Sequence, residues 1–550
     1  MSWNFGDIFE QVGKVVPADA PALIHGDRSI NWGELDRTTT NLAHQLLKHG
    51  AKAGDKVTFY MRNGPEYLQT LIAVFKASMI HVNINYRYVK DELTYIIDNS
   101  DSSIVVFDTE FSDRIEAIKS ALPEVRLWVE VGAKNSDKKN GDKKNDYLNF
   151  EALTALHCDD PFPVRSPDDL LFLYTGGTTG LPKGVMWRHD DLCTILKAGF
   201  DGFRDFDGFR DIEQPKDLAS HIENIKQHGP GNTVIPASPL MHGTGLMAGV
   251  FALINGGCVV TMTKRGFDAE ETLIAIEKHQ VKSLSMVGDA FARPLLKELD
   301  SNPEKYNINS LKVITSSGVM CSPALKQGLL RHNDQMVLLD RFGASEAIGF
   351  GTSETTASQG MTVAKFMVGE NCKVFTENHE EVEPGSGIPG FIARSAPIPL
   401  GYYKDDEKTA KTFPVIDGVR YSIPGDWCTV DKDGTLTLLG RGSVCINTAG
   451  EKVYPEEVEE ILKSYSTVED ALVIGIPDEK WGQSVTGVVQ LVEGQDLDEQ
   501  AVRDFVREKL AGYKVPKRIL SKRNLERSPN GKADYKGITK FAVDSLAQEA

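Results

Sequence analysis

Apolar and polar residues alternate with two different periods along roughly the first 160 residues of the chain. Short apolar runs at 56–60 and 104–107 indicate buried strands. Between them, residues 66–77 carry apolar side chains at helical spacing. Strands that alternate with helices are typical of a doubly wound sheet. The pattern therefore predicts an α/β fold for this part of the chain.

The composition changes after Gly440. The residues from 455 to 463 predict a helix, with a proline in its first turn and acidic residues behind it. Strands are expected at 471–476 and 485–492, and a second helix at 498–510. A chain of 550 residues is also too long for one compact core. We predict a large N-terminal domain of doubly wound β-sheets with helices (1–440) and a small C-terminal α+β domain (441–550), with the boundary at Gly440–Ser443.

One uncharged stretch, residues 227–263, is apolar enough over 246–262 to suggest a transmembrane helix. Prolines and glycines divide it into shorter pieces. We expect a loop, a buried helix near 246–253 and a buried strand at 258–262 instead, and no transmembrane segment.

Charge and cysteine content limit the possible partners. The 61 basic and 78 acidic residues give a net charge of −17, which argues against nucleic acid as a partner. The lysine-rich stretch 132–146 also contains aspartates and lacks aromatics until Tyr147, so it predicts a solvated surface loop. Seven scattered cysteines without a C-x-x-C pair indicate reduced thiols. With no basic and apolar leader at the start, we expect a cytoplasmic protein.

The hexapeptide Phe-Asp-Gly-Phe-Arg-Asp occurs at 200–205 and again at 206–211. Two copies are too few for a solenoid. They indicate a local duplication within an insertion that ends near Gly231, and we assign no function to it.

A loop rich in glycine and threonine follows the apolar run 170–173, which predicts a buried strand. Residues 174–185 read Tyr-Thr-Gly-Gly-Thr-Thr-Gly-Leu-Pro-Lys-Gly-Val, so four glycines, three threonines and one lysine fall within twelve residues. Glycine backbones let N–H groups approach one anion, while hydroxyls add donors and lysine adds charge. The spacing is not that of a Walker A motif. A solvated turn without a ligand is the alternative, but the particular order favours a polyphosphate site.

With this loop the chain resembles the adenylate-forming synthetases, which include acyl-CoA synthetases, adenylation domains of peptide synthetases and luciferases. The resemblance implies that the loop binds ATP and that Lys183 takes part in catalysis. The loop residues implied in nucleotide binding are Thr175, Gly176, Gly177, Thr178, Thr179, Gly180 and Lys183.

Residues 341–346, Arg-Phe-Gly-Ala-Ser-Glu, match the family's aromatic-Gly-x-Thr-Glu pattern, with Ser345 in place of threonine. The resemblance implies that Phe342 stacks on adenine, that Gly343 lets the substrate carboxylate approach the α-phosphate, and that Ser345 belongs to the nucleotide site. It also implies that Glu346, together with Thr178, holds Mg²⁺. A hard cation that bridges phosphates prefers a carboxylate ligand.

Two further segments resemble adenine and ribose contacts of the family. The strand-like run 311–314 is followed by Thr-Ser-Ser-Gly, whose Ser317 and Gly318 match a small-residue turn that lines adenine. Asp426, in Ile-Pro-Gly-Asp, matches the aspartate that accepts hydrogen bonds from the ribose hydroxyls. Each motif alone is also compatible with an ordinary turn.

The segment 439–447 resembles the family's hinge. Arg441 matches an arginine that contacts the ribose-phosphate region, and Ser443 stands at the pivot, where aspartate or lysine is usual. A small residue there can absorb a large backbone rotation.

Near the C-terminus, Arg-Ser-Pro-Asn-Gly-Lys at 527–532 resembles the family's closing turn. The resemblance implies that Lys532 completes the adenylation site, where fixed positive charge stabilises the developing negative charge. His242, in Pro-Leu-Met-His-Gly, matches a position at the entrance of the acyl pocket, and a core or capping histidine is the alternative. Gly343 and His242 are thus the implied contacts of the acid.

The resemblance implies an ATP-dependent carboxylic acid–CoA ligase with ATP, Mg²⁺ and coenzyme A as cofactors and co-substrate. The acid forms an acyl-adenylate, the small domain then swings about the hinge, and the CoA thiol displaces AMP. Residues 181–189 and 288–294 resemble those of steroid side-chain acid and fatty acid CoA ligases, so a large apolar acid is expected. A carrier-protein acceptor, a luciferase-like oxygenase and a non-catalytic acyl-nucleotide binder remain as alternatives, and a homo-oligomer is possible.

Overall fold

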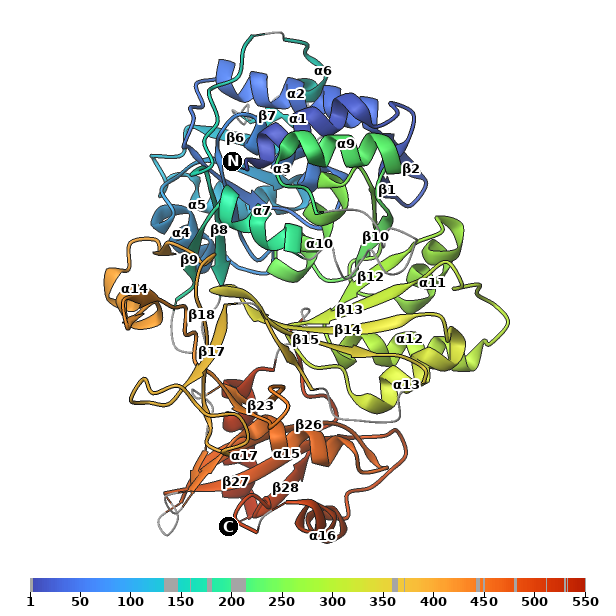
Figure 1. The fold of residues 1–550 in the computed structure, drawn as a ribbon, viewed down its shortest axis with the longest axis vertical. Helices are drawn as coiled ribbons and strands as arrows, with labels where there is room; N and C mark the ends of the chain where they lie inside the picture. The colour runs from blue at the N-terminus through green and yellow to red at the C-terminus, as the bar shows by residue number, and fades with distance from the viewer. Residues whose placement is uncertain are drawn as a thin grey trace.

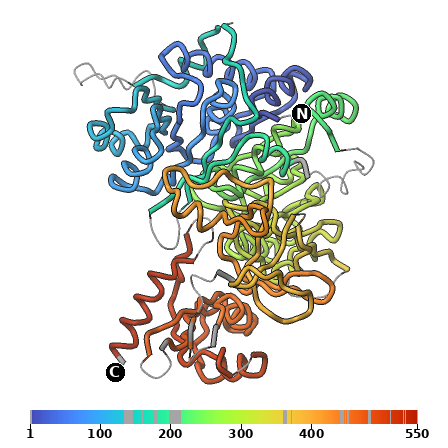
Figure 2. The backbone as a smooth tube through the Cα atoms, turned by 60° about the vertical axis from the view of Figure 1, so that its left-hand side comes forward, coloured from blue at the N-terminus to red at the C-terminus, as the bar shows by residue number. Residues whose placement is uncertain are grey.

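The computed structural model describes residues 3–132, 147–158, 160–175, 181–198, 214–358, 365–369, 371–441, 446–448, 451–478, 482–510, 512–528, 531 and 533–549. Figures 1 and 2 show the described residues from 446 onward, in dark orange to red, as a separate lobe at the opposite end of the molecule from the blue N-terminal helices.

The first of two large sheets has eight strands in the order β19-β9-β8-β4-β3-β5-β6-β7. Its central strands β8, β4, β3, β5 and β6 run parallel, and β9 returns antiparallel to β8. The parallel strands are buried on both faces, as helix-covered sheets require. The strands are β3 (Lys56–Tyr60), β4 (Ile80–Asn83), β5 (Ser102–Asp108), β6 (Leu127–Val131), β7 (Leu148–Asn149), β8 (Leu170–Thr175), β9 (Lys183–Arg188) and β19 (Gly401–Tyr402).

The second sheet has nine strands in the order β16-β15-β14-β13-β12-β10-β11-β1-β2. A parallel core from β14 to β1 is flanked by antiparallel strands on both sides. The strands are β1 (Pro21–His25), β2 (Arg28–Asn31), β10 (Thr233–Pro236), β11 (Cys258–Thr261), β12 (Ser283–Met286), β13 (Val313–Ser317), β14 (Val337–Ala344), β15 (Ala347–Thr355) and β16 (Met367–Val368).

Helices cover these sheets and share one apolar core with them. The helix α3 begins with Pro65, which suits the first helical turn, and buries all of its residues except Glu66. One cluster of buried apolar side chains joins α1, α2, α3 and α10 to strands of both large sheets. The helices of this part are α1 (Phe5–Val15), α2 (Trp32–Lys48), α3 (Pro65–Lys76), α4 (Lys90–Asn99), α5 (Ser112–Lys119), α6 (Phe150–Ala155), α7 (His189–Ala198), α9 (Leu218–His228), α10 (Gly243–Ile254), α11 (Ala269–Lys278), α12 (Asp289–Ser301), α13 (Pro323–His332) and α14 (Asp406–Thr412).

A small antiparallel sheet follows, which the sequence analysis did not predict. It consists of β17 (Cys372–Phe375), β18 (Gly390–Arg394), β22 (Asp426–Val430) and β23 (Leu436–Arg441). A two-stranded ribbon, β20 (Val415–Ile416) with β21 (Val419–Arg420), lies between them in sequence.

The C-terminal lobe is an α+β unit with its own apolar core, formed by side chains between Ile446 and Ile519. Its helix α15 (Pro455–Lys463) has Pro455 at its start, Glu456 and Glu457 in the first turn and Lys463 in the last, as the helix dipole favours. The other elements are β24 (Ile446–Thr448), β25 (Glu451–Val453), β26 (Val468–Asp478), β27 (Gly482–Leu491), β28 (Arg518–Ser521), α16 (Glu499–Lys509) and α17 (Tyr535–Glu549).

The predicted fold class is confirmed, and the predicted strands and helices quoted above lie within a few residues of observed ones. The boundary at Gly440–Ser443 stays a prediction. Among the described residues, none of the helices combines the length and apolarity needed to span a bilayer.

One expectation needs correction. The strand expected at 311–314 runs from Val313 to Ser317, because β12 and β14 pair with it on both sides; only Gly318, at a φ of 86°, makes the turn. The insertion expected to end near Gly231 stays a prediction; its described end forms α9, which packs against α1 and buries Ile222 and Ile225. The duplicated hexapeptide and residues 133–146 of the lysine-rich stretch lie outside the described residues.

Candidate active site

A large cavity opens where the carboxyl ends of strands from both large sheets meet. In open α/β sheets this edge is where ligands bind. The cavity has a volume of 2020 Å³. Pockets for single small ligands reach about 1,000 Å³, so this cavity is about twice as large. Predicted site residues on its wall are Thr175, Lys183, His242, Ser317, Gly318, Phe342, Gly343, Ser345, Glu346 and Asp426.

Thr175 and Lys183 flank the predicted polyphosphate loop at this edge. Thr175 ends β8, Lys183 begins β9, and the two face each other in the antiparallel register. The loop residues Gly176, Gly177, Thr178, Thr179 and Gly180 lie outside the described residues, so their predicted contacts stay predictions.

An ion pair holds Lys183 at the cavity. Its ammonium donates to the carboxylate of Asp405, the N-cap residue of α14. The hydrogen bond from Lys183 lowers the pKa of the Asp405 carboxyl. Sequence reasoning did not find Asp405, which lies 222 residues away along the chain.

Glu346 stands in the turn between β14 and β15, and three hydrogen bonds fix this turn. The Tyr402 hydroxyl donates to its carboxylate at 2.7 Å, and Ser422 donates to its carbonyl at 2.7 Å. The Trp187 indole donates to the carbonyl of Ser345 at 2.9 Å. The turn therefore holds one carboxylate in a set orientation at the cavity.

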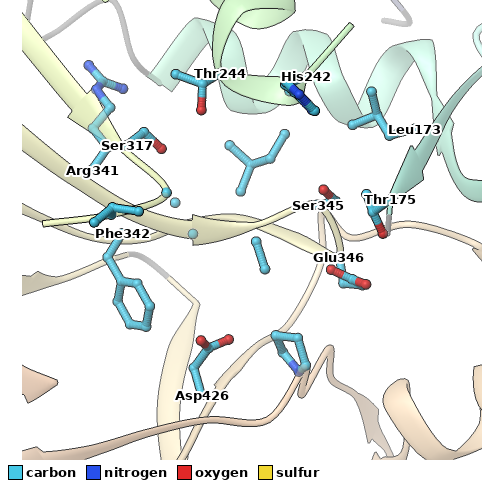
Figure 3. A pocket seen from close by; sticks show the side chains of 18 of the residues that line it. Leu173, Thr175, His242, Thr244, Ser317, Arg341, Phe342, Ser345, Glu346 and Asp426 are labelled. Carbon is cyan, nitrogen blue, oxygen red and sulfur yellow. The ribbon is translucent and has the colours of Figure 1, made fainter. Parts of the chain in front are cut away.

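Phe342 and Asp426 lie on the same side of strand β14 (Figure 3). The Phe342 ring packs against Phe350 and Phe366, with centroids 5.2 and 5.7 Å apart. Asp426 begins β22 opposite Arg441 in β23, which brings the backbones of two predicted ribose contacts together. The contact predicted for the Arg441 side chain stays a prediction.

Gly343 fills a place with little room for a side chain. An added Cβ would approach the carbonyl oxygen of Ala347 to 3.1 Å and the amide nitrogen of Gly349 to 3.2 Å, and both are backbone atoms. A glycine here keeps the strand end close to the turn that carries Glu346.

His242 precedes α10 as its N-cap residue and makes no side-chain capping hydrogen bond. Its side chain lines the cavity instead (Figure 3). The buried Asn83 fixes this segment, because its amide donates to the carbonyls of Met241 at 2.8 Å and Tyr174 at 2.9 Å. Asn83 was missed by sequence reasoning, since nothing in its neighbourhood forms a motif.

The C-terminal lobe reaches the cavity with Ser528 and Tyr535. Gly531 approaches the second sheet closely, since a Cβ on it would lie 3.1 Å from the carbonyl oxygen of Val287. Arg527 is held by a bidentate pair with Asp470 at 2.6 and 2.8 Å. Lys532 itself and the predicted pivot Ser443 lie outside the described residues. The structure thus places the neighbours of Lys532 at the cavity.

Comparison with known proteins identifies the class. The sequence profile described as "AMP-binding enzyme" matches residues 9–403, and the profile of its C-terminal domain matches residues 457–532. The chain belongs to the family of AMP-binding enzymes.

Individual relatives match almost the whole chain. A medium/long-chain-fatty-acid–CoA/3-oxocholest-4-en-26-oate–CoA ligase of Mycobacterium tuberculosis is 40% identical over 97% of this chain and 95% of its own. A 3-oxocholest-4-en-26-oate–CoA ligase of Rhodococcus rhodochrous is 39% identical over 98% and 95%. Among solved structures, ATP-bound MatB of Rhodopseudomonas palustris has a TM-score of 0.81 at 22% identity, covering 99% of both chains. At 22% identity, the likeness to MatB shows a shared fold.

Proposed function

We propose that this protein is an ATP-dependent carboxylic acid–CoA ligase that forms an acyl-AMP and then an acyl-CoA from a large, mainly apolar acid. The observation that carries the proposal is the single cavity shared by Lys183, Phe342, Glu346 and Asp426 on one side and an apolar wall on the other. The near-full-length identity to fatty-acid and steroid-acid CoA ligases supports the acid class.

In the first step, a carboxylate oxygen of the acid attacks the α-phosphorus of ATP, and the bond to pyrophosphate breaks. Negative charge increases on the α-phosphate, and Lys183 and Lys532 would stabilise it as fixed cations. Gly343 lets the acid approach, and His242 stands beside its path. The nucleotide would be held by residues 175–180, Ser317, Gly318, Phe342, Ser345, Asp426 and Arg441.

The donors present fit a magnesium ion. Mg²⁺ usually takes one or two protein carboxylates together with substrate phosphates, and Glu346 offers one oriented carboxylate at the cavity. In the described part of the chain, no three His, Cys, Asp or Glu side chains gather into a metal cage. Glu346 and the hydroxyl of Thr178 would hold the ion, which supplies charge neutralisation at the phosphates.

In the second step, the thiol sulfur of CoA attacks the acyl carbonyl carbon, and the bond to AMP breaks. The proton of the thiol is released to solvent as the new bond forms, and AMP departs as a good leaving group. We place the rotation of the C-terminal domain that prepares this step at Ser443. We also place the enzyme in the cytoplasm, because the cysteines of the described residues are free thiols.

A panel of acids assayed for AMP release, with and without CoA, tests the proposal. We expect apolar acids to give AMP and thioester at rates that depend on CoA. AMP release that responds only to a carrier-protein thiol, or light from a luciferin, would instead support the other members of the family. Binding of ATP and acid without pyrophosphate release would indicate a non-catalytic binder.

A further inference from the structure

The part of the cavity beyond Gly343 has two unlike walls. One wall is apolar and packs against the main core; it is formed by Ile195, Leu196, Met247, Phe251 and Ile348. The other wall is a face of the second sheet. Because paired residues of parallel strands share a face, the register places Ser285 and Thr315 side by side on it, followed by Ser317 and Arg341. An apolar acid would therefore lie against a polar, cationic surface on one side.

Arg341 points to this side of the cavity. It is next to Phe342 in the same strand, so the two side chains leave the strand on opposite faces. Figure 3 shows the guanidinium on the side of Thr244 and His242, away from the Phe342 ring and Asp426. Asp340, the preceding residue, points to the far face and pairs there with the buried Lys326 of α13. The carboxylate of Asp340 is thus paired with Lys326 and does not neutralise Arg341.

Nothing in the described part of the chain accepts a hydrogen bond from the Arg341 guanidinium or forms an ion pair with it. Burial alone lowers the pKa of this guanidinium, with no carboxylate nearby to raise it. Arg341 is partly buried, and its guanidinium nitrogens are open to the cavity. A partly desolvated cation without a protein partner is stabilised when an anionic group binds to it. An unpaired arginine on a ligand cavity therefore indicates a ligand group that pairs with it.

A second polar group on the same face also lacks a partner. The Oγ1 atom of Thr315 is buried and has no hydrogen-bond partner among the described residues, and Thr315 as a whole is only 9% exposed. It lies on the neighbouring strand, two residues before Ser317, which pairs with Arg341. Both groups belong to the wall that an acyl chain would meet.

We propose that Arg341 binds a second carboxylate on the acyl substrate, so that the preferred acid is an apolar dicarboxylic acid rather than a plain fatty acid. The planar guanidinium matches a carboxylate through two parallel hydrogen bonds. The reacting carboxylate is a different group. It belongs beside Gly343 and Glu346, whereas Arg341 lies two residues deeper in the strand, about 7 Å back at the rise of a β-strand.

This proposal rests on the proposed function and deepens it by naming the substrate class. Its test compares monocarboxylic acids, α,ω-dicarboxylic acids and terminal oxo acids of matched chain length. The quantity measured is kcat/KM for CoA-dependent AMP release by the full-length enzyme and by Arg341→Met. Arg265→Met is the matched control, because that arginine is 77% exposed and pairs with Glu110 away from the cavity.

We expect the unmodified enzyme to prefer the diacid over the matched monoacid. In Arg341→Met this preference should fall by at least about 10- to 100-fold, the range that a single hydrogen bond to a charged group contributes. Arg265→Met should keep it. Should Arg341→Met fail to fold, Arg341→Gln takes its place and should show the same fall in preference; an unchanged preference in that variant would overturn the assignment to Arg341.

A preference for plain acids, or for oxo acids without the diacid, would overturn the proposal. An equal loss on all acids in Arg341→Met would overturn it too, since Arg341 would then serve the reacting carboxylate or the nucleotide. These outcomes leave the ligase function intact, whereas no CoA-dependent AMP release from any acid would refute that function itself.

Discussion

Replacing Tyr402 with phenylalanine removes one hydroxyl and leaves the ring in place. Tyr402 is 4% exposed and packs beside Phe413, so the fold around it should persist. The lost group is the donor to the Glu346 carboxylate at 2.7 Å. Because Glu346 is the proposed magnesium ligand, the substitution tests whether its orientation matters.

The magnitude follows from what remains around Glu346. A hydrogen bond to a charged group contributes about 1.5–3 kcal/mol. Ser422 and Trp187 still fix the backbone of the turn, so only the direction of the carboxylate is lost. We therefore take the lower end, about 1.5 kcal/mol, which corresponds to about a tenfold change. Tyr402→Phe should raise the magnesium concentration for half-maximal activity about tenfold.

The assay is acid-dependent exchange of pyrophosphate into ATP, measured against magnesium concentration. Tyr403→Phe is the matched control, because its hydroxyl bonds to the exposed Asp101 at 2.7 Å rather than to Glu346. In a Glu346→Gln background, which should itself raise the magnesium requirement, Tyr402→Phe should add little. The reasoning is refuted if Tyr402→Phe and Tyr403→Phe show the same magnesium dependence as the unmodified enzyme.

Three further substitutions test other parts of the structure. Lys532→Ala should slow acyl-AMP formation on the order of 10²-fold while CoA transfer from preformed acyl-AMP continues; equal loss in both half-reactions, measured separately, would contradict its role in adenylation. Ser443→Pro fixes φ near roughly −65° and should let acyl-AMP accumulate with slow thioester formation in single-turnover experiments; unchanged rates would move the pivot elsewhere. Lys326→Met leaves Asp340 buried without its cation and should lower the free energy of unfolding in urea by about 3–5 kcal/mol; an added Asp340→Leu should restore most of it, and Lys305→Met, at an exposed lysine, should change little.

Local patterns explain what could be predicted from the sequence. The strand at 56–60 and the helix at 455–463 depend on short-range periodicity and capping, and both are present in the structure. The antiparallel sheet of β17, β18, β22 and β23 was missed, because its strands are short and pair across long separations, as Gly390 does with Cys428. Long-range pairing leaves little local signal.

For the same reason, only some residues of the candidate site could be predicted from the sequence. Phe342, Glu346 and Asp426 lie in motifs, and the structure places all three on one cavity. Their supports lie in no motif: Tyr402 meets Glu346 across 56 residues, and Asn83 meets Met241 across 158. Arg341 lies inside a motif whose predicted roles belong to the neighbouring residues. Its different position became clear from the structure, because side chains alternate between the two faces of β14.

The short strand β19 has a consequence for how the molecule melts. It adds to the edge of the first sheet through Gly401 and Tyr402, while Tyr402 also holds the Glu346 turn of the second sheet. Together with the shared core, this ties the two large sheets into one cooperative unit. The C-terminal lobe has a separate core and so forms a second unit. Calorimetry of the ligand-free protein should therefore show two transitions, and a nucleotide that contacts both units should bring them together by mass action.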